Sequence, residues 1–208
     1  MTTNESFVNK KLENNFKNRK IDILWFNNFQ EVTAHLLTQI PIEATIGIGN
    51  SQTLKKMALT KAFLNRGNTV YDKTLGNTHE EIKKLKRKAL LTDYYISSVN
   101  AISEDGRIIN IDHSGNRVAA ITYGPEKVFL VVGKNKIATT HEEALTRARN
   151  TAAPLNAKRA KMNPPCVEEE KCVDCHSPER ACNTITITEG QHINGRLTVL
   201  IVNEEAGF

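Results

Sequence analysis

The spacing of apolar residues predicts helices at the start of the chain. Residues 5 to 20 have helical character, and Pro41 should end a second helix over residues 27 to 39. The apolar positions of this second helix fall on one face: Phe29, Val32, Leu36 and Leu37. We therefore expect residues 1–40 to form an N-terminal helical segment.

From residue 41 onward the pattern alternates between strand and helix. A β-branched run and a Gly-rich turn lead into a helix that should open at Ser51 and end at Gly67. Its buried face is predicted to consist of Leu54, Met57, Ala58 and Leu64. A strand at residues 69 to 71 follows, and the next helix should begin at Thr78.

The second half of the chain continues the alternation. Strands are expected at 94–96 and 108–109 around the turn 104–106, and later at 127–132, 184–188 and 197–202. Helices are expected at 116–123 and at 141–153, the latter interrupted by Pro154. The sequence thus predicts an α/β fold with a mainly parallel sheet flanked by helices. Residues 41–160 would form its core, and residues 161–208 a cysteine-bearing loop plus the final core strand.

Composition narrows the class of protein. The chain has 208 residues, and it lacks the ~20 consecutive apolar residues of a membrane span. Its polar first residues contain no apolar run with a cleavage site, so we expect a cytoplasmic protein. The net charge is +5, with basic clusters at 83–88 and 158–161, but aromatic residues make up only 6%. We interpret the clusters as solvated helix faces that attract small anions, not as nucleic-acid sites.

A Gly-rich turn between strand and helix is the first candidate site. Glycines allow a ligand close to the backbone, and polar residues beside them can donate to a phosphate or carboxylate. The candidate ligand-binding residues are Gly47, Gly49, Asn50, Ser51 and Thr53. A plain β-to-α turn with Ser51 as N-cap remains the alternative, because neither a third glycine nor a Gly-Lys-Ser/Thr sequence is present.

Polar residues crowd the segment 98–116, the second candidate site. Loops at the carboxyl ends of parallel strands are where open α/β sheets bind ligands. The candidate ligand-binding residues are Asn100, Asn110, Asp112 and Asn116, and Glu104 and Asp112 are the candidate acid–base residues. Ordinary hairpin turns are the alternative for this segment, above all at Asp105-Gly106.

All four cysteines lie within residues 164–182 and form the third candidate site. Cys166, Cys172, Cys175 and Cys182 have the spacing C-x5-C-x2-C-x6-C. Four thiolates suit a four-iron–four-sulfur cluster or zinc, because both accept tetrahedral sulfur ligation. The pentapeptide at 172–176 also reads C-x-x-C-H, a haem-attachment signature, which would leave Cys166 and Cys182 unexplained. Four structural thiols without metal are the remaining alternative.

Three segments together resemble one family. They are "GIGNSQTLKK", "SVNAISEDGRIINIDHSGNRVAAITYGPEKVFLVVGKNKI" and "AAPLNAKR…PCVEEEKCVDCHSPERACN". They look like the lactate-utilisation (LUD) domain family, in its short single-domain branch with a cysteine-bearing C-terminus. The resemblance implies a fold like that of the ribose-phosphate isomerase, glucosamine-phosphate deaminase and CoA-transferase superfamily, whose Gly-rich loop holds a phosphate or acyl-carrier group. Asn100 stands where the isomerases often have a catalytic aspartate, so isomerase chemistry would need another acid or base.

The resemblance implies a role in oxidising a hydroxy acid such as lactate. We expect an electron-transfer or accessory component with a four-iron–four-sulfur cluster, or zinc instead, on the four cysteines. It would bind an anionic small molecule and work beside other iron–sulfur subunits, and a homo-oligomer is compatible with the sequence. Two other functions stay open. One is a non-redox isomerase- or transferase-like enzyme on a phosphorylated or CoA-linked acid, and the other is a non-catalytic sensor of a small molecule.

Overall fold

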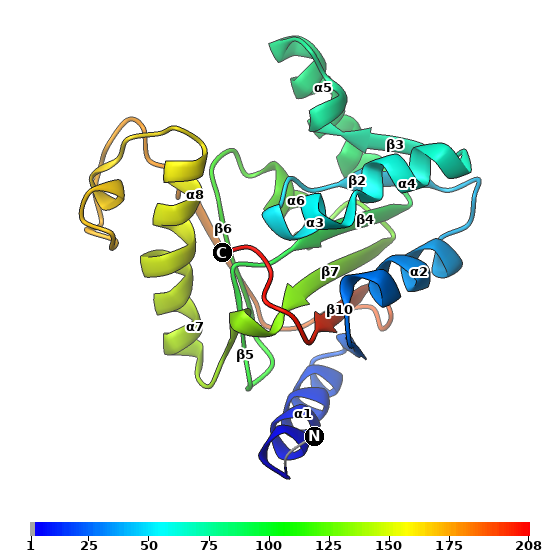
Figure 1. Ribbon diagram of the computed structural model, residues 1–208, viewed down its shortest axis with the longest axis horizontal. Helices are drawn as coiled ribbons and strands as arrows, with labels where there is room; N and C mark the ends of the chain where they lie inside the picture. Colours follow the sequence, from blue (N-terminus) through cyan, green and yellow to red (C-terminus); the bar gives the residue numbers. More distant parts are fainter. Residues whose placement is uncertain (1–2) are drawn as a thin grey trace.

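A six-stranded sheet, all of its strands parallel, forms the centre of the computed structural model, which describes residues 3–208 (Figure 1). The strand order is β1-β10-β7-β4-β2-β3. The bounds are β1 Asp22–Phe26, β2 Thr45–Ile48, β3 Thr69–Asp72, β4 Tyr94–Ser98, β7 Lys127–Gly133 and β10 Leu197–Val202. The predicted α/β fold with a mainly parallel sheet is therefore confirmed.

A second, four-stranded sheet lies beside the first, in the order β8-β5-β6-β9. Its strands are β5 Ala101–Ser103, β6 Ile108–Asp112, β8 Ile137–Ala138 and β9 Thr184–Thr188. The turn at 104–106 joins β5 to β6, and not the strand at 94–96 to β6 as the sequence predicted. The strand β4 instead pairs with β2 and β7. Two residues, 99 and 100, carry the chain from one sheet to the other, and hydrophobic pattern alone does not show such a crossing.

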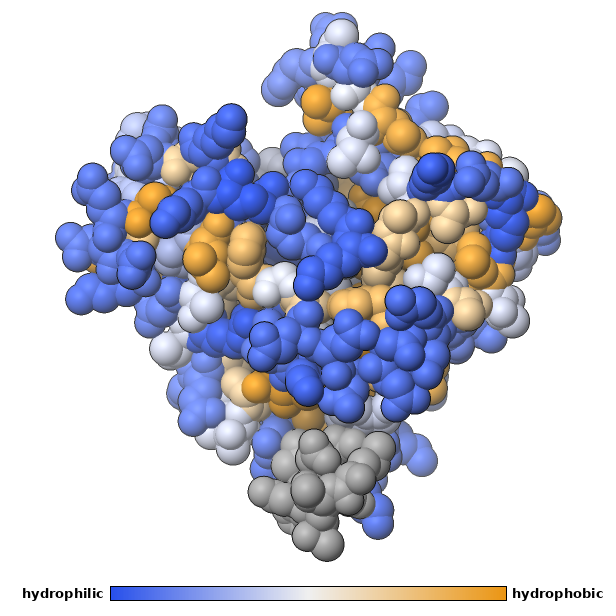
Figure 2. Space-filling view, viewed as in Figure 1, coloured by the Kyte–Doolittle hydropathy of each residue, from blue (hydrophilic) through white to orange (hydrophobic). Residues whose placement is uncertain are grey.

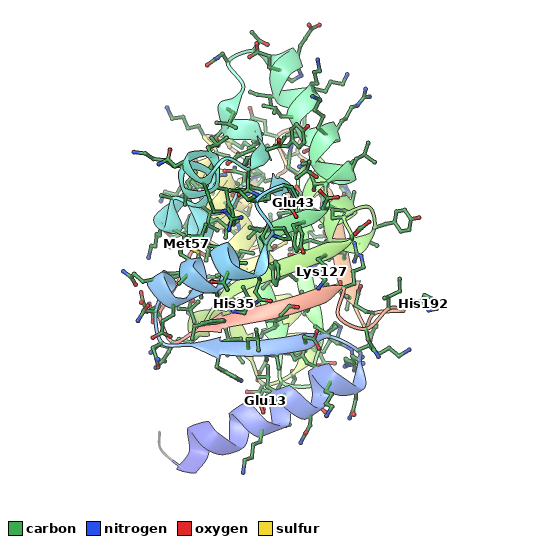
Figure 3. All side chains as sticks on the ribbon, turned by 90° about the vertical axis from the view of Figure 1, so that its right-hand side faces the viewer. Glu13, His35, Glu43, Met57, Lys127 and His192 are labelled. Carbon is green, nitrogen blue, oxygen red and sulfur yellow. The ribbon has the colours of Figure 1, made fainter. Side chains whose placement is uncertain are left out.

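Helices cover both faces of the parallel sheet. Their bounds are α1 Thr3–Asn18, α2 Phe29–Gln39, α3 Gln52–Met57, α4 Leu59–Arg66, α5 His79–Lys88, α6 Asn116–Thr122, α7 His141–Arg147 and α8 Ala153–Arg159. Helices α2, α3 and α4 share one buried cluster with the sheet, and α1 and α6 share another. Figure 3 shows α2 lying across the strands at His35, whose ring is 6.5 Å from that of Phe129. No helix within residues 3–208 is long and apolar enough to cross a membrane.

The predicted helix from Ser51 to Gly67 is in fact two helices. Ala58 takes a left-handed conformation with φ of 49°, which ends α3 and starts α4. Because of this break, the buried face of α4 does not continue the buried face of α3. Leu59 and Phe63 are the residues of α4 that are buried. The expectation that Ala58 and Leu64 lie in the buried face is therefore wrong, since both are exposed.

Pro154 does not interrupt the helix as expected. A π-helical turn over Ala148–Ala152 follows α7, and α8 begins at Ala153 with Pro154 in its first turn. The π-helical turn directly before Pro154, in which the Ala153 N–H donates to the Ala148 carbonyl, accommodates the proline without ending the helix. Small alanines on this side, among them Ala144 and Ala148, pack against the second sheet. Helix α7, the π-helical turn and α8 together form one continuous helical column. This column borders the cysteine segment (Figure 1).

The segment 22–26 forms β1, an edge strand that the sequence analysis did not predict. It pairs in parallel with β10, for example Trp25 with Ile201. The indole Nε1 of Trp25 donates to Glu13 of α1 at 2.8 Å. Residues 3–40 therefore contribute a strand to the sheet as well as two helices.

Candidate functional site

A polar cavity of about 200 Å³ opens at the carboxyl edge of the parallel sheet. Its walls come from the segments that follow β2 and β4, from the end of β6 and the start of α6, and from α8. Hydrophilic residues gather on this face of the molecule, between α8 and α3 (Figure 2). This is the position at which open parallel sheets bind small molecules.

Six of the predicted ligand-binding residues line this cavity together. They are Asn50, Ser51, Thr53, Asn100, Asp112 and Asn116. The structure thus brings the first and second candidate sites, which are some fifty residues apart in sequence, to one place. Two of these side chains also make hydrogen bonds within the fold. Ser51 Oγ caps α3 by accepting from Thr53 N at 3.1 Å, and Asn100 Oδ1 accepts from Ile111 N at 2.9 Å.

The two predicted glycines serve packing and do not line the cavity. A Cβ on Gly47 would lie 2.7 Å from Tyr95 Cδ2, and one on Gly49 would lie 2.6 Å from Ser97 Oγ. Both contacts are closer than real Cβ atoms tolerate, so the glycines allow β2 to pack closely against β4. The glycines contribute to the site indirectly, because the close packing of β2 positions the backbone that places Asn50 in the cavity lining.

Glu104 and Asn110 also lie outside the cavity lining. Glu104 Oε2 is 2.9 Å from Lys11 Nζ, and its carbonyl accepts from Asn15 of α1 at 2.7 Å. Asn110 is fully buried, and its Oδ1 accepts from Arg117 at 3.0 Å. Asp112 is the one predicted acid–base residue that the structure brings to the cavity.

Five cations line the cavity. Two of them belong to the basic clusters 83–88 and 158–161, which the sequence analysis expected to attract small anions, and the other three were not singled out. The five are Lys73, Lys86, Arg117, Lys136 and Arg159. Asp112 is the one acidic side chain among the lining residues, and its Oδ2 is 3.7 Å from Arg117 Nε. The cavity therefore carries a clear excess of positive charge, which favours anionic ligands.

Lys136 is buried at the bottom of the cavity, with 3% of its surface exposed. Its Nζ donates to Ser98 Oγ at 3.0 Å, to the Val99 carbonyl at 3.0 Å and to Thr53 Oγ1 at 3.2 Å. All three acceptors are neutral. Burial, with the added repulsion of Arg147 and Arg117, lowers the pKa of Lys136 to about 7.

Arg117 joins the two sheets behind the cavity. Its guanidinium donates to the Ser98 and Ile111 carbonyls, each at 2.7 Å, and to the side chains of Asn100 and Asn110, each at 3.0 Å. Asp112 Oδ2 accepts from the Arg117 backbone N–H at 3.1 Å. A planar fork with several donors is suited to this role, and a lysine could not replace it.

Three further cations stand at the other end of the cavity, near α5 and α8. Lys86 Nζ is 3.2 Å from Ser114 Oγ, and Arg159 Nη2 donates to Asn156 Oδ1 at 2.9 Å. The pKa of Lys73 is lowered by burial first, and then by the charges of Lys86 and Arg159. Asp112 and Asp72 partly offset this effect, and the net positive charge at this end favours an anion.

The geometry of the fold agrees with a comparison with known families. The family model described as the LUD domain matches residues 9–202. The chain belongs to the LUD domain family. No curated protein matches the chain. The crystal structure of a DUF162 family protein from Deinococcus radiodurans is similar, with a TM-score of 0.54 and 14% sequence identity. The similarity covers 95% of this chain and 98% of that one, and at this identity it concerns the fold alone.

The four cysteines of this LUD domain lie in one loop between α8 and β9. All four are free and partly buried. Burial first, and then the charges of Cys175, Cys182 and Cys172, raise the pKa of Cys166. Within residues 3–208, however, no three His, Cys, Asp or Glu side chains are close enough to hold a metal ion. The four thiols are of the right chemical type to ligate a metal, and their side chains are not gathered round one point.

Contacts with the helical column hold this loop. The Cys172 N–H donates to Asn150 Oδ1 at 3.1 Å, and Arg149 lies 3.7 Å from Asp174. Arg180 Nη2 lies 3.5 Å from Cys182 Sγ, as a donor to it. A second cavity, of about 280 Å³, opens between this column and Cys166. The loop is therefore held against the π-helical turn Ala148–Ala152, which leads directly into α8 and its Arg159.

Proposed function

We propose that this LUD domain binds a small anionic molecule in the cationic cavity and takes part in oxidising a hydroxy acid such as lactate. The observation that carries the proposal is the set of five cations facing one carboxylate, at the edge of the sheet where α/β proteins bind ligands. A hydroxy acid supplies a carboxylate for the cations and a hydroxyl for neutral polar groups. Asn50 and Asn100 line the cavity and provide such groups.

The cavity residues would bind and orient the acid. Lys136 Nζ already donates to three neutral acceptors, so it would attract a carboxylate through its buried positive charge and not through a further hydrogen bond. Asp112 is held by Arg117 and would repel a second anion from its side of the cavity. Such an arrangement fixes which end of an asymmetric acid lies deepest.

The cysteine loop would hold the redox group of the same protein. Cys166, Cys172, Cys175 and Cys182 are the residues that would ligate a four-iron–four-sulfur cluster, with zinc as the alternative. A bound cluster would supply one-electron transfer. Arg180 would lower the charge on the Cys182 sulfur by the hydrogen bond that it already donates. The chain would then relay electrons to other iron–sulfur subunits.

Metal and sulfide analysis of protein purified without oxygen tests the redox part. We expect a brown protein with about four irons and four sulfides per chain. Cys172→Ala and Cys182→Ala should lower the iron content to a similar extent, and Ser177→Ala, a matched change in the same loop, should leave it unchanged. One zinc in a colourless protein, or independent effects of the two cysteines, would contradict a shared cluster.

Asp112 supports a second candidate function, a non-redox isomerase- or transferase-like reaction on a phosphorylated or CoA-linked acid. It is the one predicted acid–base residue in the cavity, and its Oδ2 accepts from Arg117. Turnover of such an acid should disappear in Asp112→Asn while binding persists. Binding without turnover in the unaltered protein would instead identify a sensor.

A further inference from the structure

The most exposed apolar side chains of the described residues all lie at one edge of the parallel sheet, opposite the cavity. Four large hydrophobic residues have more than half of their surface exposed, between 54% and 86%. Each stands in the segment that leads into a strand, three or four residues before the strand begins. They are Ile42 before β2, Leu91 before β4, Tyr123 before β7 and Ile193 before β10. We call these four residues the amino-edge row.

The four segments are neighbours in space. Their strands are adjacent in the order β10-β7-β4-β2 and run parallel, so the amino ends lie side by side. At about 4.8 Å between neighbouring strands, the four strand starts span about 14 Å. The loops of Leu91 and Tyr123 touch, since a Cβ on Gly124 would clash with the Leu90 carbonyl oxygen. Single exposed apolar residues are ordinary on a surface, but a row of them along one edge indicates an interaction surface.

Exposed cations flank both ends of the amino-edge row. Helix α5 leads from β3 back to β4, so its acidic first turn lies away from the row and its basic end lies beside Leu91. This helix buries none of its residues and projects from the body of the protein (Figure 1). The exposed cations at this edge are Lys84, Arg87 and Lys88 on α5, Lys127 at the start of β7, and Lys17 and Lys20 ahead of β1. The exposed acids there are fewer: Asp22, Glu43 and Glu126.

This arrangement favours a lipid surface over a second copy of the chain. An interface between proteins buries about 800 Å² on each partner, usually as one continuous patch, whereas the row consists of four side chains on separate loops. Two copies paired row to row would also bring cations against cations, because cations flank both ends. On a bilayer, apolar side chains enter the boundary between headgroups and acyl chains, while lysines and arginines contact anionic headgroups. Tyrosine is enriched at this boundary.

We propose that the amino edge of the sheet docks the protein on an anionic lipid bilayer, with Leu91 and Tyr123 inserted at the centre of the contact. The cations of α5 and β7 then face the headgroups. No residue of the row lines the cavity, so the proposal is independent of the proposed function. The cavity opens at the carboxyl edge of the same sheet and stays open to water when the protein is docked. Figure 3 shows the edge that would face the bilayer at the right, where His192, next to Ile193, precedes β10.

Co-sedimentation of the full chain with lipid vesicles tests the proposal. The vesicles contain phosphatidylcholine alone or phosphatidylcholine with phosphatidylglycerol, at low salt and at about 0.15 M salt. We expect the mixed vesicles to bind the protein at least 10-fold more tightly than phosphatidylcholine alone, and the added salt to weaken this binding. Absence of binding to the mixed vesicles at low salt would overturn the proposal. Equal binding to both kinds of vesicle would also overturn it, because the cations would then have no part.

Two double variants test the two components of the contact. Leu91→Ser with Tyr123→Ser removes the two most exposed apolar side chains and should weaken binding to the mixed vesicles at least 10-fold. Lys84→Glu with Arg87→Glu reverses two exposed charges of α5 and should also weaken it at least 10-fold. Unchanged binding in both double variants would show that another surface meets the lipid, and the proposal would be wrong.

Matched controls change the same residue types elsewhere. Leu155→Ser replaces a partly exposed leucine on α8, and Lys55→Glu with Lys134→Glu reverses two exposed charges on the segments that follow β2 and β7. These controls should leave vesicle binding unchanged. Thermal melts identify a variant that fails to fold, and the remaining double variant then decides. Light scattering covers the other occupant: a dimer that dissociates in the Leu91→Ser, Tyr123→Ser variant, without vesicle binding, would assign the row to a second copy and overturn the proposal.

Discussion

Removal of the Lys136 charge should change how stability depends on pH. The ammonium is buried at 3% exposure and donates only to neutral oxygens, so its charged form is disfavoured in the folded protein. We therefore predict that Lys136→Met loses the part of the pH dependence that this group causes. The substitution keeps the length of the apolar stem and deletes only the titrating nitrogen.

The magnitude follows from the two pKa values. In the unfolded chain Lys136 has its ordinary pKa of 10.5, and in the folded chain the pKa is about 7. Between these values the unfolded state binds more protons, so the free energy of unfolding rises with pH. The stability due to neutral Lys136 is fully present above the unfolded pKa and is lost as the pH falls through about 7. Integration from pH 7 to pH 9 gives about 2 kcal/mol.

Urea unfolding at pH 7, 8 and 9 measures this difference, with the fluorescence of the single tryptophan, Trp25, as the signal. The stability of the unaltered chain minus that of Lys136→Met should increase by about 2 kcal/mol over this range. The same difference for Lys134→Met should stay constant, because that lysine is exposed. A constant difference for Lys136→Met as well would show that Lys136 stays charged when buried, and would refute the reasoning.

Three other substitutions test the packing round the site. Arg117→Lys should lower the free energy of unfolding by about 2 kcal/mol or more, because one ammonium cannot reach the four acceptors that the guanidinium contacts. A loss below about 0.5 kcal/mol in urea unfolding would contradict this role. Gly47→Ala should cost about 1–3 kcal/mol, since its Cβ meets Tyr95, and an unchanged melting curve would show that β2 can shift. Ala58→Gly should stabilise the chain by about 0.5 kcal/mol by relieving a left-handed alanine, and destabilisation would contradict the break between α3 and α4.

Much of the fold could be predicted because its elements carry local signals. The apolar run 127–132 lies in β7, and all residues of that run after Lys127 are buried. The predicted helix start at Thr78 is confirmed by a capping box in which Thr78 and Glu81 exchange hydrogen bonds. Such features depend on residues near one another in sequence, so a single sequence contains them.

The errors occurred where the fold depends on distant contacts. The strand β1 is defined by its pairing with β10 at the other end of the chain, and the left-handed turn at Ala58 has no glycine to mark it. The effect of Pro154 was misjudged because the π-helical turn before it accommodates the proline, and no local residue signals such a turn.

The candidate site was predictable only in part, for the same reason. Turn chemistry drew attention to Asn50, Asn100 and Asp112, which the structure brings to one cavity. Of the cations that give the cavity its charge, Lys86 and Arg159 fall in the two basic clusters noted in the sequence. Lys73, Arg117 and Lys136 look like any surface lysine or arginine. Lys136 in particular follows an ordinary strand, and only the tertiary structure buries it.

The most direct test of the anionic cavity is an NMR titration of Lys136 in ¹³C-lysine-labelled protein, with and without L-lactate. The lysine signal that disappears from the spectrum of Lys136→Met is assigned to Lys136. An anion about 4 Å away at an effective dielectric of about 20 stabilises the ammonium by about 4 kcal/mol, enough to raise its pKa by more than one pH unit. We predict a pKa near 7 in the free protein and a clear rise when the acid is bound. An ordinary lysine pKa that the acid leaves unchanged would contradict the account.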